Sequence, residues 1–78
     1  MNMQNTDLDR LQAAYKAAVD GWINAIRHEE ELASVEHSLA RVDLWENAHF
    51  LAEEARQKAG AAKAAYEDGL RRTFFDIR

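Results

Sequence analysis

The chain has 78 residues, 47% hydrophobic and 31% charged, with a net charge of −4 and with neither cysteine nor proline. The lack of cysteine excludes a disulfide framework, a thiolate zinc site and a cysteine nucleophile, and the acidic balance argues against binding nucleic acid through its phosphates. No apolar run approaches the roughly 18–20 residues of a membrane span, so we expect a small, soluble, cytoplasmic protein with no membrane partner.

Helix is the secondary structure that the composition favours along the whole chain. Alanine is abundant and loses no side-chain entropy in a helix, and no proline interrupts the backbone ladder. The first predicted helix spans about residues 7–39, with Thr6 and Asp9 in the spacing of a capping box at its start. Its apolar residues recur in steps of three and four and therefore share one stripe: Leu8, Leu11, Tyr15, Ala18, Val19, Trp22, Ala25 and Ile26.

The second predicted helix spans about residues 43–75, and Asp43 is the residue expected to cap its start. Its apolar stripe is longer: Leu44, Ala48, Leu51, Ala55, Ala59, Ala62, Tyr66, Leu70, Phe74 and Ile77. The connection between the helices is predicted around residues 38–42. Since that segment has neither glycine nor proline, one long kinked helix is the alternative.

Two helices of this length with a short connection predict an all-α fold, an antiparallel two-helix hairpin that forms a single domain of residues 1–78. With the turn near residue 41, Trp22 lies opposite Ala59–Ala62 and Tyr66 lies opposite Ala17 and Ala18, so large residues face small ones. One hairpin of this size buries little apolar surface. We therefore expect two hairpins to dimerise into a four-helix bundle with coiled-coil packing.

A metal site is the alternative interpretation of four residues: Glu29, His37, Glu46 and His49. Glu46 and His49 have the E-x-x-H spacing by which one helix offers two ligands in ferritin-like carboxylate bundles. The predicted core stripe points Glu46 toward solvent, however, and such a short motif arises often by chance. We therefore expect no metal and no other cofactor. If the alternative of a metal site holds, these four residues are its expected ligands.

Glu29 needs a separate explanation, because it interrupts the apolar stripe of the first helix. A buried carboxylate must be paired, hydrogen-bonded or protonated. The prediction is that the bundle ends before Glu29, which is then exposed, or that Arg56 or Lys58 reaches it.

Four residues are the predicted interface: Trp45, Phe74, Phe75 and Ile77. Phe75 lies off the stripe and beside arginines, a combination typical of protein interfaces. No Ser/His/Asp arrangement or glycine-rich phosphate loop occurs, so we expect no catalytic residues. The expected function is that of a self-associating interaction or assembly module. A second, unidentified protein is a further expected type of partner. The alternatives are a ferritin-like metal-binding protein whose site forms between protomers, and a small chaperone-like adaptor of a secretion or phage system.

Overall fold

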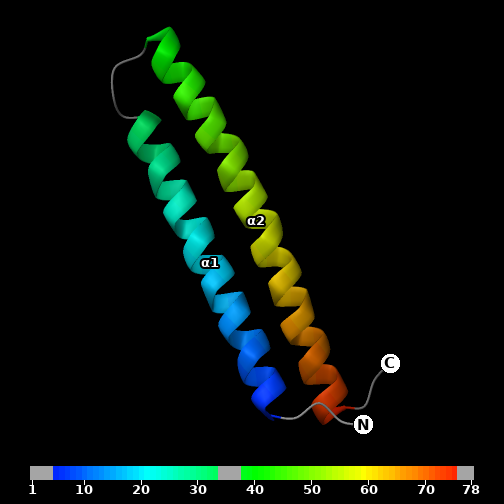
Figure 1. Cartoon of the computed structure of the whole chain (residues 1–78). Helices are drawn as coiled ribbons and strands as arrows, with labels where there is room; N and C mark the ends of the chain where they lie inside the picture. Colours follow the sequence, from blue (N-terminus) through cyan, green and yellow to red (C-terminus); the bar gives the residue numbers. More distant parts are fainter. Residues whose placement is uncertain (1–4, 34–37, 76–78) are drawn as a thin grey trace.

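The computed structural model describes residues 5–33 and 38–75, and within those ranges it contains helices and no strand. Helix α1 runs from Asn5 to Ala33 and helix α2 from Leu39 to Phe74. Figure 1 shows the two helices side by side and antiparallel, with the start of α1 next to the end of α2. This arrangement confirms the predicted all-α helical hairpin.

The hairpin is a thin rod whose Cα atoms extend over 57 × 19 × 12 Å. Each helix has a single neighbour, so the hairpin contact covers one stripe of each and leaves the other faces open. In the described part of the chain, neither helix has a segment long and apolar enough to cross a membrane.

The connection between the helices lies earlier in the chain than predicted. Ser38 is the N-cap of α2: its backbone is extended, and its hydroxyl accepts a hydrogen bond of 3.3 Å from the backbone N–H of Arg41. Serine is a preferred cap because it satisfies one of the N–H groups that the first turn leaves without a partner. Asp43, the predicted cap, therefore lies inside α2, and Thr6 lies within the first turn of α1, which begins at Asn5.

Helix α1 ends at Ala33 rather than near residue 39. Its last turn holds no basic residue, and Glu29, Glu30 and Glu31 lie close to that end. Carboxylates near a helix C-terminus oppose the helix dipole, so these charges weaken the last turns of α1. Gly21, by contrast, does not interrupt α1, as expected for a lone glycine that costs about 1 kcal/mol.

The covered stripe of α1 contains large side chains, and the buried residues of α2 are small. The large residues on the covered stripe of α1 are buried or half-buried: Leu8, Leu11, Tyr15, Trp22 and Leu32. The buried residues of α2 are all small: Ala48, Ala52, Ala59 and Gly69. Small residues let two helices approach closely and leave room for bulky neighbours.

Three residues of the predicted stripe of α2 lie outside this contact. Leu44, Leu51 and Phe74 are 50%, 52% and 65% exposed, so their assignment to the hairpin core was wrong. The covered residues repeat instead in alternating steps of four and three: Ala48, Ala52, Ala55, Ala59, Ala62, Tyr66 and Gly69. This is the narrow seam of a helix pair with a period of 3.5 residues, and its position follows the alanines because they permit the closest approach.

The register also differs by a few residues from the prediction. Tyr66 lies next to Tyr15, with ring centroids 6.2 Å apart, rather than opposite Ala17 and Ala18. Because the connection comes earlier in the chain, each residue of α2 meets a position of α1 that is slightly nearer the N-terminus.

Candidate functional site

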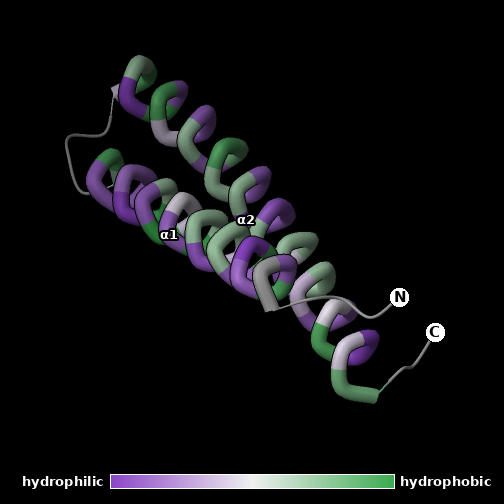
Figure 2. Tube along the Cα trace, turned by 60° about the horizontal axis from the view of Figure 1, so that its bottom comes forward, coloured by the Kyte–Doolittle hydropathy of each residue, from purple (hydrophilic) through white to green (hydrophobic). Residues whose placement is uncertain are grey.

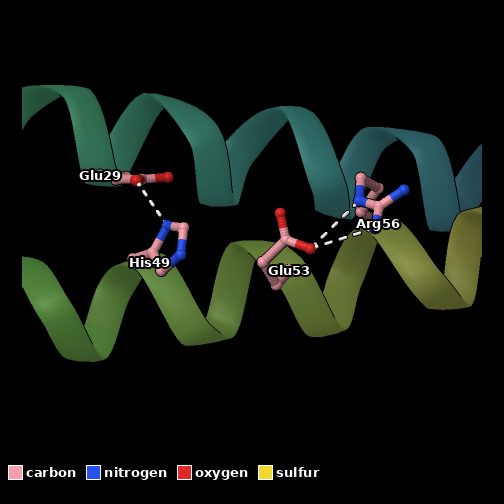
Figure 3. A network of polar contacts seen from close by, with 4 residues as sticks. All are labelled: Glu29, His49, Glu53 and Arg56. Atoms are coloured by element: carbon pink, nitrogen blue, oxygen red, sulfur yellow. Dashed lines mark hydrogen bonds and ion pairs between the residues drawn. The ribbon is translucent and has the colours of Figure 1, made fainter.

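A polar contact joins the two helices near the loop end of the hairpin. Nδ1 of His49 on α2 lies 3.1 Å from Oε2 of Glu29 on α1, and Figure 3 shows the two side chains pointing toward each other. The Glu29 side chain is 22% exposed and that of His49 is 44% exposed. Because an ionised carboxylate only accepts hydrogen bonds, the N–H at Nδ1 of His49 is the donor.

Glu29 is neither fully exposed nor without a partner. It occupies the covered stripe of α1, one turn beyond Ala25 and one turn before Leu32. A carboxylate largely removed from water needs a hydrogen bond, which His49 donates. Among the described residues that are not exposed, every buried side-chain nitrogen or oxygen has a hydrogen-bond partner.

The two residues predicted to reach Glu29 are engaged within their own helix. Arg56 pairs with Glu53 at 3.2 Å, and Lys58 pairs with Glu54 at 3.7 Å. The first of these pairs lies along α2 in Figure 3, one turn beyond His49. The prediction of Arg56 or Lys58 as the partner of Glu29 was therefore wrong, because the earlier connection brings His49 there instead.

Two aromatic side chains of α2 lie next to the His49 ring. The ring stacks on Trp45 with centroids 5.6 Å apart and an angle of 16° between the planes. Phe50 lies at 5.8 Å with a tilt of 56°. Trp45 precedes His49 by one helical turn, the spacing at which helix side chains become neighbours. The stack and the hydrogen bond to Glu29 together fix the orientation of the imidazole.

The structure brings together two of the four residues of the predicted metal set. Glu29 and His49 meet, Glu46 is exposed, and His37 lies outside the described residues. Within residues 5–33 and 38–75, no three histidine, aspartate or glutamate side chains gather in an arrangement that can hold a metal ion. The contact that remains has the geometry of a hydrogen bond between two side chains.

Large apolar side chains gather on the surface near the loop end. Of the large hydrophobic residues that the structure describes, ten are exposed, and eight of these lie between residues 23 and 51. These eight are Ile23, Ile26, Leu39, Val42, Leu44, Trp45, Phe50 and Leu51. Figure 2 shows hydrophobic stretches recurring along the loop end of α2. A helix that is apolar on several sides needs more cover than one neighbouring helix provides.

Sequence reasoning placed Glu29 and His49 in one candidate set but did not pair them. The predicted register put His49 opposite a position about five residues after Glu29, and the earlier turn removes that offset. Phe50 was missed altogether, since it lies on neither apolar stripe. The alternating spacing of the alanines in α2 was the available signal for the true contact stripe.

Comparison with protein-family models, with curated proteins and with solved structures gave no match to this chain. The class that the fold defines is an all-α helical hairpin. At the loop end its surface combines the satisfied Glu29–His49 contact with exposed apolar side chains.

Proposed function

We propose that this chain is a self-associating helical module that acts in protein interaction or assembly and not as a catalyst. The observation that carries the proposal is the accessible surface. The chain exposes 6126 Å², whereas a compact monomer of 8.9 kDa exposes about 4,800 Å². The excess reflects the rod shape of the hairpin, which leaves ten large hydrophobic side chains of the described residues exposed.

The thin interior of the hairpin supports the same proposal. Among the described residues, the buried hydrophobic ones are Leu8 and three alanines, Ala48, Ala52 and Ala59, and no large side chain is fully buried. Hydrophobic stabilisation scales with the apolar area removed from water, at about 25 cal/mol per Å². Alanines contribute little area, so a second copy that covers the exposed leucines and aromatics stabilises the fold considerably.

The proposed interface residues lie at both ends of the rod. Trp45 is 36% exposed at the loop end, and Phe74 and Phe75 are 65% and 69% exposed at the opposite end, while Ile77 lies outside the described residues. Aromatic side chains in such positions commonly anchor interfaces. We propose that two hairpins form a four-helix bundle, in the cytoplasm, where a chain without cysteine needs no oxidising compartment.

The mass in solution tests this proposal. We expect sedimentation equilibrium to give about 18 kDa, twice the 8.9 kDa of the chain, across the micromolar range. The melting temperature should rise with protein concentration, because association stabilises the folded state by mass action. A constant mass of 8.9 kDa together with cooperative unfolding at a fixed temperature would refute self-association.

A further inference from the structure

A shallow groove of about 340 Å³ lies between the helices on one side of the hairpin. Its lining combines small residues of α1 with a leucine, an alanine and an ion pair of α2: Ala17, Ala18, Gly21, Leu51, Glu54, Ala55 and Lys58. Leu44 lies two turns before Leu51 and therefore on the same side of α2. We call these lining residues together with Leu44 the groove face.

We infer that the groove face is the surface through which the chain self-associates, and that a second copy of this chain occupies it. The two α2 helices then run antiparallel, and Leu51 of each copy lies over the small residues around Gly21 of the other. This inference rests on the proposed self-association and specifies one surface for it, namely the groove face and not the aromatic residues Trp45, Phe74 and Phe75 at the ends of the rod.

Gly21 is what opens the groove on the α1 side. A Cβ atom added at Gly21 meets no atom within 4 Å, so the packing of the hairpin itself does not require glycine there. Glycine in the middle of a helix weakens it relative to alanine. The close approach of another chain is a physical reason for a glycine at this position.

Leucines on the α2 side form a ridge that matches this hollow. Leu44 and Leu51 are 50% and 52% exposed, and their spacing of seven residues aligns them along one side of the helix. A ridge beside a hollow on the same face is self-complementary under two-fold symmetry, since each copy offers both halves of the contact. Large residues of one copy then meet small residues of the other, as they do within the hairpin.

The charges in the groove are also self-complementary. Glu54 and Lys58 lie 3.7 Å apart, and their side chains remain 65% and 73% exposed, so both can reach another chain. Suppose that the two-fold axis of an antiparallel pair crosses α2 between Glu54 and Lys58. Glu54 of each copy then meets Lys58 of the other copy. A second copy therefore matches both the shape and the charges of the groove, and this favours it over an unrelated helix.

Gly60 provides a matched control for Gly21. An added Cβ atom at Gly60 also meets nothing within 4 Å, but this glycine is not among the groove residues. Its neighbours one turn away are the charged Arg56 and Lys63. The same substitution at the two glycines therefore makes the same change to helix propensity and differs in whether it obstructs the groove.

The experiment compares Gly21→Gln with Gly60→Gln by sedimentation equilibrium, with circular dichroism as the measure of folding. We expect both variants to be at least as helical as the unmodified chain. Gly21→Gln should weaken the dimer by about tenfold or more, because the added side chain overfills a close contact, and Gly60→Gln should leave it unchanged. Glu54→Lys should also weaken the dimer, and the added Lys58→Glu should restore it.

The results distinguish the two proposals. If the unmodified chain dimerises and both glycine variants dimerise equally well, the groove face is not the interface, although self-association stands. Equal weakening by both variants, or a failure of Lys58→Glu to rescue Glu54→Lys, also overturns the assignment of this face. An unmodified chain that stays monomeric at all concentrations removes self-association itself.

Discussion

Replacing Glu29 by leucine should stabilise the hairpin, because Glu29 occupies a largely covered position of α1. Its side chain is 22% exposed, so a leucine there buries about three-quarters of its surface, which contributes about 1–2 kcal/mol. The variant loses the hydrogen bond from His49, whose net contribution is about 0.5–1.5 kcal/mol. Since the His49 side chain is 44% exposed, water replaces much of that bond. We expect a net gain of about 1 kcal/mol, or about 4–8 °C in melting temperature.

The control for this prediction is Glu30→Leu. Glu30 is exposed and adjacent to Glu29, so its replacement removes the same charge from the end of α1 without placing a side chain in the helix contact. Urea and thermal unfolding followed by circular dichroism should be measured at one concentration and association state, because association shifts apparent stability. If Glu29→Leu is less stable than Glu30→Leu by about 1 kcal/mol, the Glu29–His49 contact contributes more than the burial argument allows.

Four further substitutions or additions test the helix contact, the cap of α2, the metal alternative and the C-terminal end of the rod. Ala59→Leu should lower the free energy of unfolding by about 1–3 kcal/mol, because it overpacks a position that is 4% exposed. Ala61→Leu, on the exposed side of α2, should change that free energy by less than about 0.5 kcal/mol. Equal effects of the two substitutions would place the helix contact elsewhere. Ser38→Ala should cost about 1 kcal/mol in unfolding experiments by removing the cap of α2, and no loss would contradict the capping role. Zinc or manganese should shift the melting temperature by no more than about 1 °C, and a larger shift abolished by His49→Ala would favour a metal site. Phe75→Ala should leave helicity unchanged, since this side chain is 69% exposed; a loss of association measured by light scattering would place the interface at the end of the rod and not on the groove face, and unfolding at constant association would show that Phe75 belongs to the core.

The helical class and much of the covered stripe were predictable because both follow from local composition. Alanine content and steps of three and four determine helix and stripe without knowledge of the partner. The position of the turn was not predictable to the residue, because Ser38 and Asp43 are both good caps and the sequence alone does not rank them. The error at the turn then shifted the register, and the shift hid the contact of Glu29 with His49.

Two leucines were misassigned to the covered face of α2 for a different reason. Leu44 and Leu51 are the most hydrophobic residues of their segment, so a search for apolar periodicity places them inward. The hairpin instead turns inward the side that contains Ala48 and Ala52, because close approach of two helices depends on small residues as much as on apolar ones. The leucines are consequently left for a contact that a single chain does not make.

The alanine face raises the question of what fixes the alignment of the two helices. Five alanines repeat along it at alternating steps of four and three: Ala48, Ala52, Ala55, Ala59 and Ala62. A slide of α2 by one seven-residue repeat therefore exchanges alanine for alanine over much of the contact, and packing alone distinguishes poorly between such registers. In one direction, the slide moves Tyr66 into the place that Ala59 now occupies, opposite Trp22. The space there fits an alanine, so a tyrosine would overpack the contact and oppose this slide.

In the other direction, the contact between Glu29 and His49 opposes the slide. A shift of seven residues would place Val42 where His49 now lies, and valine cannot donate a hydrogen bond to the Glu29 carboxylate. A polar residue at one position of a helix seam specifies register at some cost in stability, which is why Glu29→Leu is expected to be more stable than the unmodified chain. The same alignment places Gly21 of α1 and Leu51 of α2 in the lining of one groove. On this reasoning, a contact that adds little to the stability of one hairpin positions the surface through which two hairpins are proposed to associate.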